Sequence, residues 1–232
     1  TKNCFLQTLC EQIDDSRSEV ILNNKIDLDN LSSCAKESFR DRLTLDNTRI
    51  DNMISSVQDI IKLPDPIGKM LDIGVRPNGL KIKKVRSPIG VVGIIYESRP
   101  NVTTDASALC IKSGNSAILR GGSEAINTNL SLSKLIQKSL IANSVDPYSV
   151  QIISDTSRDL VTELVTTDKY IDLIIPRGSK ELLRFLKAHS KIPMIKHLDG
   201  NCHVFIDEFA DLAKALKISI NSYKRVLVCF EN

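Results

Sequence analysis

Aromatic side chains are scarce in this chain of 232 residues, and tryptophan is absent. Only 4% of the residues are aromatic while 42% are hydrophobic, so a sizeable core is available but it must be aliphatic. No apolar run approaches the ~20 residues that a membrane-spanning helix needs, and no signal peptide is visible. The chain begins at Thr1 rather than Met, which leaves room for a leader or an earlier segment. The length allows one large domain or two small ones.

Paired cysteines and a strong net charge are also missing. The six cysteines form no C-x-x-C pair, which argues against a zinc site or a disulfide framework and favours a reducing cytoplasm. They are Cys4, Cys10, Cys34, Cys110, Cys202 and Cys229. A net charge of +3 suits small phosphorylated ligands and gives no case for nucleic acid. No predicted strand is followed by a strict G-x-G-x-x-G, which disfavours a dehydrogenase of the common two-half dinucleotide type.

Residues 1–62 are predicted to form a helical lead-in. Apolar residues recur at helical spacing in Phe5–Asn23 and more clearly in Thr48–Lys62, and the prolines of Leu63-Pro-Asp-Pro66 end the second helix. Gly79–Arg86 alternates apolar and basic residues, as an exposed strand does. On the residues alone, an edge strand guarded by lysine is the favoured interpretation of this segment.

Strands and helices alternate after Ser87. The predicted strands are Pro88–Ile95, Ser116–Leu119, Val150–Ile153, Ile171–Ile175, Met194–Ile195 and His203–Ile206. The predicted helices are Thr103–Ser113 with Thr103 as N-cap, Glu124–Asn143, Ser157–Thr166, Ser179–His189 and Asp207–Asn221. Repeated βα units predict an α/β fold with a mainly parallel, Rossmann-like sheet covered by helices.

The most informative stretch is Ser87–Asn129. Pro88–Ile95 is a continuous apolar run that is typical of a strand buried on both faces, and Tyr96-Glu-Ser-Arg-Pro-Asn101 interrupts it with polar residues. A second strand ends at Arg120-Gly-Gly-Ser-Glu124. Both polar loops follow strands, at the position where an open α/β sheet binds ligands.

These loops carry a family resemblance. Tyr96–Thr103 and Arg120–Glu124, together with Asp168–Ser179 and His197–His203, closely resemble the γ-glutamyl phosphate reductases of the aldehyde dehydrogenase superfamily. The likeness covers nearly the whole chain. It implies a helical lead-in at 1–62, an NADPH-binding α/β domain at 63–222 and the start of a truncated catalytic domain at 223–232. It also implies that residues 79–90 contribute to an oligomerisation hairpin.

The resemblance places the adenosine ribose of the cofactor at the second loop. Arg120, Gly121, Ser123 and Glu124 are its implied contacts, and a 2′-phosphate within reach of Arg120 would favour NADPH over NADH. The alternative is a tight strand-to-helix turn in which Ser123 caps the helix and Glu124 offsets its dipole. The same resemblance sets Gly178 and Ser179, which open a helix directly after a strand, against the pyrophosphate.

The implied reaction reduces γ-glutamyl phosphate to glutamate 5-semialdehyde, the second step of proline biosynthesis. A cysteine thiolate displaces phosphate from the acyl carbon, and the thioester then accepts hydride from NADPH. Cys229 is the implied nucleophile, Asn101 the oxyanion donor and Arg99 the phosphate contact. The alternatives are that Asn101 only caps a helix and that Arg99 is only a solvated side chain.

Cys229 departs from the family pattern, because bulky residues precede it where the family has Pro and small residues. Taken alone, Val226–Phe230 is typical of a buried strand with an inert thiol. A metal site at Asp199, Cys202 and His203 is the disfavoured alternative, since the family reaction is metal-free.

The resemblance also predicts a chain truncated at both ends, homo-oligomeric when full length and inactive as these 232 residues. Other hypotheses are a catalytically dead remnant that only binds nucleotide or oligomerises, another acylating aldehyde dehydrogenase, and a reductase fused behind a glutamate kinase.

Overall fold

Four helices open the chain, as the lead-in prediction requires. The computed structural model describes residues 1–32, 34–157, 159–195 and 203–230, with the backbone alone at 72–73 and 224–230. The four helices are α1 (Lys2–Asp15), α2 (Arg17–Asp29), α3 (Glu37–Leu43) and α4 (Asn47–Lys62). The helix expected at Thr48–Lys62 is confirmed as α4, whereas Phe5–Asn23 is divided between α1 and α2. The division of the chain into domains remains a prediction.

A parallel four-stranded sheet forms the centre of the molecule. Its strands are β3 (Val91–Ile95), β4 (Ser116–Arg120), β5 (Val150–Ile152) and β6 (Leu173–Pro176), in the spatial order β5-β4-β3-β6. The connecting helices are α5 (Pro100–Lys112), α6 (Ile126–Ala142), preceded by a short 3-10 helix η1 (Ser123–Ala125), and α7 (Asp159–Thr166). A second 3-10 helix, η2 (Pro147–Ser149), leads into β5, and α8 (Lys180–His189) follows β6. The predicted mainly parallel α/β sheet is therefore confirmed.

The chain winds in two directions from β3. It runs outward through β4 to β5 and then returns across the sheet to place β6 on the other side of β3. The direction of winding thus changes between β3 and β6. In open α/β sheets, the crevice at the carboxyl ends of the strands beside such a switch is the usual ligand site.

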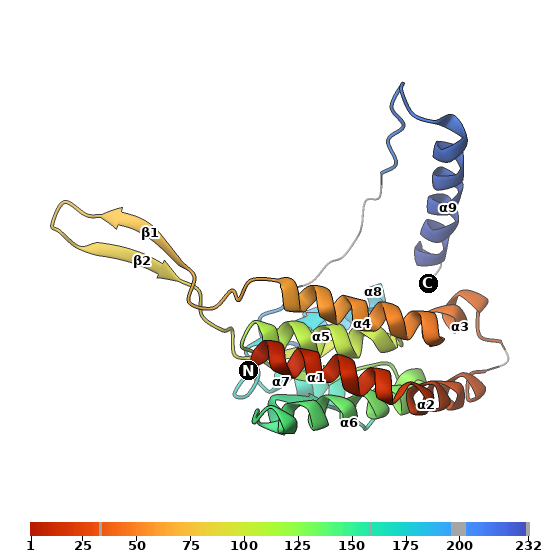
Figure 1. Ribbon diagram of the computed structural model, residues 1–232, viewed down its shortest axis with the longest axis horizontal. Coiled ribbons are helices and arrows are strands. Elements are labelled where there is room, and N and C mark those ends of the chain that lie inside the picture. The colour runs from red at the N-terminus through yellow and green to blue at the C-terminus, as the bar shows by residue number, and fades with distance from the viewer. Residues whose placement is uncertain (33, 158, 196–202, 231–232) are drawn as a thin grey trace.

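Helices cover both faces of the sheet with aliphatic side chains. One core cluster joins α1 and α4 to α5, α6 and the sheet, with Phe5, Leu9 and Val57 fully buried. A second cluster joins the other face to α7 and α8. The lead-in helices are therefore part of the main core, and Figure 1 shows α1, α2 and α4 lying over α5 and α6.

The exposed strand predicted at Gly79–Arg86 is confirmed, and it is one half of a separate hairpin, as the family resemblance implied for residues 79–90. Strand β2 (Lys81–Val85) pairs antiparallel with β1 (Met70–Val75) and belongs to a two-stranded sheet of its own, which projects from the body in Figure 1. A bulge interrupts β1 between Asp72 and Gly74, where Gly74 adopts a φ of 126°. The irregular, exposed β1 has no regular alternation, which explains why the sequence did not predict it.

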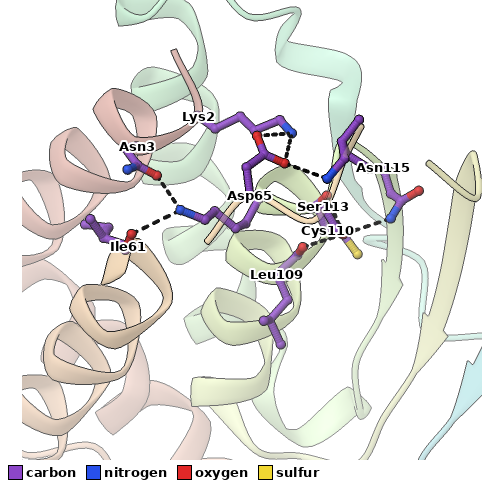
Figure 2. Close-up of polar contacts among 10 residues, drawn as sticks. Lys2, Asn3, Ile61, Asp65, Leu109, Cys110, Ser113 and Asn115 are labelled. Carbon is purple, nitrogen blue, oxygen red and sulfur yellow. Dashed lines mark hydrogen bonds and ion pairs between the residues drawn. The ribbon is translucent and has the colours of Figure 1, made fainter. Parts of the chain in front are cut away.

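A polar cluster lies where the start of α1 and the segment that leads into β1 meet the end of α5. Lys2 pairs with Asp65 at 2.9 Å, and the pKa of Asp65 is lowered by the backbone N–H of Ile67 and by Lys2 (Figure 2). The buried ammonium of Lys112 donates to Asn3 Oδ1 at 2.6 Å and to the carbonyl oxygen of Ile61 at 3.0 Å. These bonds hold the ends of α1, α4 and α5 together.

Several predicted boundaries are wrong. Helix α5 begins at Pro100 with Arg99 as its N-cap residue, because proline suits the first helical turn; Thr103 is therefore inside the helix and caps nothing. The expected second short strand, His203–Ile206, is not formed. Met194 makes only an isolated parallel bridge to Ile174.

The last helix, α9, spans Leu212–Phe230 rather than Asp207–Asn221. Asp211 Oδ1 accepts the N–H of Ala213 at 2.9 Å and that of Lys214 at 3.1 Å, which begins the helix later than expected. The backbone of 226–230 continues this helix, so the prediction of a strand there is wrong. Among the described residues, no helix is long and apolar enough to cross a membrane.

Candidate functional site

Three polar turns meet at the carboxyl edge of the parallel sheet. They follow the neighbouring strands β4, β3 and β6, and they carry the predicted site residues. The backbone N–H of Tyr96 donates to the carbonyl oxygen of Arg120 at 3.0 Å, and that of Arg177 donates to the carbonyl oxygen of Ile95 at 2.7 Å. The parallel ladder thus continues into the turns and holds them side by side.

The β3 and β4 turns touch at a glycine. A Cβ atom added to Gly122 would lie 2.1 Å from Ser98 Oγ and 2.9 Å from the backbone nitrogen of Ser98. Ser98 Oγ donates to Glu124 Oε2 at 2.6 Å, which ties the two turns together. Glycine is therefore required at 122 for the close approach of the two turns, and neither this contact nor the bridging role of Ser98 was predicted.

The neighbouring glycine, Gly121, packs against a buried relay of hydrogen bonds that joins Tyr96, Thr103 and Asn129. A Cβ atom on Gly121 would lie 2.3 Å from Asn129 Nδ2 and 3.2 Å from the ring of Tyr96. The Tyr96 hydroxyl shares a 2.7 Å hydrogen bond with Thr103 Oγ1, which donates to Asn129 Oδ1 at 2.8 Å. Burial raises the pKa of Tyr96 to about 12. The relay therefore packs the neutral phenol ring of Tyr96 and the amide of Asn129 against the Gly121 backbone.

Arg120 ends β4 beside the loop that follows β5. Its Nη2 donates to the carbonyl oxygen of Thr156 at 3.0 Å. This contact orients the guanidinium at the carboxyl end of β4. A guanidinium carries five N–H donors in a planar fork that matches a phosphate.

The third turn opens α8. Ser179 is its N-cap residue, since Ser179 Oγ accepts the backbone N–H of Leu182 at 3.3 Å. A Cβ atom on Gly178 would lie 2.8 Å from Leu182 Cδ2 and 3.8 Å from Glu97 Cγ. The β6 turn therefore packs beside the β3 turn, with the N-terminus of α8 at the same edge of the sheet.

The alternative in which Ser123 caps a helix is wrong. Neither η1 nor α6 has a side-chain cap from its own N-cap residue. Ser123 is exposed, and Glu124 accepts the bond from Ser98 described above. Both residues belong to the turn that follows Arg120 at the carboxyl end of β4.

The two predicted substrate residues lie at the start of α5. Arg99 is exposed and in extended conformation just before Pro100, which restricts the backbone of the residue that precedes it. Asn101 is also exposed, and its Nδ2 donates to Asp105 Oδ2 at 3.2 Å. Ser56 Oγ donates to Asp105 Oδ1 at 2.9 Å, while burial raises the pKa of Asp105.

The thiols divide into exposed and buried groups. Cys4 and Cys34 are exposed, whereas Cys10 and Cys110 are buried, and burial raises the pKa of Cys110 to about 11. From the sequence, Cys110 and Cys34 are both interpreted as packing thiols; Cys110 is one, but Cys34 is exposed, so the interpretation is wrong for Cys34. Position 229 lies in the backbone of α9, and its side chain is outside the described residues.

The alternative metal site is only partly placed. Asp199 and Cys202 lie outside the described residues, while His203 is exposed. No group of three or more His, Cys, Asp or Glu side chains able to hold a metal ion occurs in the part of the chain that the structure describes.

The edge has the features that a dinucleotide needs. Arg120 supplies a guanidinium and α8 presents its N-terminus, while Gly122 and Gly178 let neighbouring protein atoms pack closely around the turns that carry these groups. Sequence reasoning missed the parts that hold these groups in place: Ser98, Thr156 and the Tyr96–Thr103–Asn129 relay. Only Ser98 carried a signal, as a small polar residue inside a recognisable turn.

The family model described as "Aldehyde dehydrogenase family" matches residues 25–225, and the chain belongs to that family. Members of this family use a nicotinamide dinucleotide, NAD or NADP. The guanidinium of Arg120 and the N-terminus of α8 at the sheet edge fit such a ligand.

The most specific similarities are to γ-glutamyl phosphate reductases. The chain is 44% identical to that of Psychrobacter arcticus over 222 residues, which are 95% of this chain and 52% of the relative. The solved structure from Thermotoga maritima is 42% identical with a TM-score of 0.84, covering 95% of this chain and 53% of that one. The yeast structure is 34% identical with a TM-score of 0.76, covering 97% and 57%. The predicted resemblance is confirmed, and the chain spans about half the length of these relatives.

Proposed function

We propose that this chain forms the NADPH-binding part of a γ-glutamyl phosphate reductase. The observation that carries the proposal is the contact of Gly122 with Ser98, which joins two polar turns at the carboxyl edge of neighbouring parallel strands. The similarity to reductases of that name supports the choice of substrate.

In this proposal the adenosine ribose lies beside the β4 turn. Arg120, Gly121, Ser123 and Glu124 surround it, and Arg120 contacts a 2′-phosphate. The pyrophosphate lies against Gly178 and Ser179 at the N-terminus of α8. The bound nicotinamide supplies hydride to the reaction.

The substrate groups lie at the start of α5. Arg99, fixed ahead of Pro100, holds the phosphate of the acyl phosphate, and Asn101 donates to the developing oxyanion. Asp105 keeps the amide of Asn101 oriented, because a carboxylate accepts only from its NH2 group. Cys229 forms the bond to the acyl carbon as phosphate departs.

A fluorescence titration with NADPH and NADH tests the cofactor site. The wild-type protein binds NADPH more tightly than NADH, and Arg120→Leu lowers NADPH affinity roughly tenfold with a smaller change for NADH. Arg120→Lys is the matched control, since it keeps the charge but loses the planar fork. Its NADPH affinity is expected to fall between those of the wild type and Arg120→Leu. A wild-type protein that binds neither nucleotide contradicts the proposal.

A turnover assay with γ-glutamyl phosphate and NADPH tests the reaction. The prediction that the 232 residues alone are inactive is tested by comparing them with a longer chain that restores the length of the relatives. Activity of the longer chain with a different acyl phosphate would favour another acylating aldehyde dehydrogenase. Cys229→Ser abolishes activity of whichever form turns over, and unaltered activity would exclude Cys229 as the nucleophile.

The same proposal makes the active protein a cytoplasmic homo-oligomer. The hairpin formed by β1 and β2 extends away from the main core. It exposes four large apolar side chains, those of Met70, Leu71, Val75 and Val85. Pairing of this hairpin with another subunit would cover them. Light scattering of the longer chain with and without Leu71→Asp measures this directly, and an unchanged mass would contradict it.

A further inference from the structure

Helix α6 begins with a cap that comes from a distant part of the chain. Asp27 of α2 is only 2% exposed. Its Oδ1 accepts the backbone N–H of Asn127 at 3.1 Å and Asn127 Nδ2 at 2.8 Å. Its Oδ2 accepts the backbone N–H of Thr128 at 2.8 Å and Thr128 Oγ1 at 2.6 Å. One buried carboxylate thus satisfies two otherwise unpaired amides of the first turn and offsets the positive end of the helix dipole.

The residue before α6 supplies no such cap. The N-cap residue is Ala125, which has no side-chain acceptor. Asn24, one turn earlier in α2, strengthens the contact from Asp27: its Nδ2 donates to Thr128 Oγ1 at 3.2 Å and to the carbonyl oxygen of Leu43 at 2.8 Å. Asn24 Oδ1 accepts the N–H of Leu45 at 2.7 Å. The cap is therefore fixed on both sides by buried hydrogen bonds.

The capped turn adjoins the nucleotide-binding turn. The residue after Thr128 is Asn129, whose Nδ2 lies so close to Gly121 that a Cβ atom there would be 2.3 Å away. Ser123–Ala125, the 3-10 turn between Gly122 and α6, leads directly into the capped residues. If the first turn of α6 frays, Asn129 no longer packs against Gly121, and the 3-10 turn that follows Gly122 is no longer anchored. The Arg120–Glu124 turn then loses its support at both points.

We propose that Asp27 is a positioning residue for the adenosine half of the dinucleotide. This inference rests on the proposed function, and it adds a residue that lies outside the turns themselves. The carboxylate also occupies the anion-binding end of α6, so a cofactor phosphate is directed to Arg120 and to the N-terminus of α8. Loss of the cap lowers the population of the binding-competent turn, and apparent affinity falls in proportion to that population.

The test measures dissociation constants for NADPH and for adenosine 2′,5′-bisphosphate, at a temperature where each variant is fully folded. Asp27→Ala weakens both ligands by a similar factor, roughly tenfold. Asp27→Asn keeps the side-chain volume and one acceptor oxygen, so it gives a smaller loss and does not depend on the alanine variant folding. The equal loss for the adenosine fragment places the whole effect in that half of the site.

Asp46→Ala is the matched control. Asp46 caps α4 by accepting the N–H of Arg49 at 2.7 Å, and its replacement leaves in place the bond from the N–H of the neighbouring Leu45 to Asn24. It also removes a helix cap and lowers the unfolding midpoint, but it leaves both dissociation constants unchanged. A general loss of stability would make the Asp27 and Asp46 variants behave alike.

The outcomes separate the two proposals. If the wild-type protein binds NADPH and both Asp27 variants bind it equally well, the positioning role is wrong while the proposed function stands. If the wild-type protein binds no NADPH, the proposed function fails and the positioning role fails with it. A loss at Asp27 that Asp46→Ala reproduces also overturns the positioning role.

Discussion

Replacing Gly122 by alanine tests the close contact between the β3 and β4 turns. The new methyl group would meet Ser98 Oγ at 2.1 Å and the backbone nitrogen of Ser98 at 2.9 Å. Rotation of the serine relieves the first contact but breaks its 2.6 Å bond to Glu124. The second contact involves backbone, so one of the two turns must move.

The expected cost follows from these two contacts. A hydrogen bond to a charged group contributes about 1.5–3 kcal/mol, and the exposure of Glu124 puts this one at the lower end. Displacement of the turn adds roughly 1 kcal/mol, the lower end of the cost of overpacking. Gly122→Ala is therefore expected to lower the free energy of unfolding by about 2–3 kcal/mol and to weaken NADPH binding roughly tenfold.

A double-mutant cycle with Ser98→Ala provides the control. Without the Ser98 hydroxyl there is no 2.1 Å contact and no bond to lose, so Gly122→Ala costs about 1.5 kcal/mol less in that background, which leaves about 1 kcal/mol for the displaced turn. Urea unfolding and NADPH titration of the four proteins measure both effects. If the two substitutions are additive, or if Gly122→Ala is neutral, the inferred contact between the turns is wrong.

Two further predictions concern titrating groups. With a thiol reagent at pH 8, Cys4→Ser removes one fast-reacting thiol, whereas Cys110→Ala alters only the thiols released on unfolding, because Cys110 is buried with a pKa of about 11. A slower or smaller fast phase in Cys110→Ala would contradict its burial. Burial raises the pKa of Asp105, so the folded state holds this proton more tightly than the unfolded state, and the contribution of Asp105 to stability falls as pH rises from about 3.8 through its folded pKa. The stability of Asp105→Asn relative to wild type should rise over that window and then level off in urea titrations; a flat difference would mean that the pKa of Asp105 is not raised.

Most of the sheet was predictable because its strands are short apolar runs that end at polar turns. Val91–Ile95 and Leu173–Pro176 lie near their expected positions, and the parallel order places their turns at one edge. The residues of those turns were predictable for the same reason, since Arg120 ends one strand and Ser179 lies three residues after the end of another.

The errors come from local signals that compete with one another or with distant contacts. Thr103 was expected to cap α5, but Pro100 starts the helix earlier and leaves the Thr103 hydroxyl to join Tyr96 and Asn129. The β-branched residues near 226–230 indicated a strand, yet their backbone continues α9. Asp27 gave no signal at all, because a polar residue on a largely polar helix reveals nothing about a partner 100 positions later.

The packing of α1 and α2 on α6 also has a consequence for biosynthesis. The first 29 residues emerge from the ribosome long before residues 126–142, on which they pack. Contacts of such large sequence separation slow folding, because a long loop must close before they form. Phe5, Leu6 and Leu9 therefore lack part of their final packing surface until more than a hundred further residues have been translated, and the nascent chain is a natural client for chaperones during that interval.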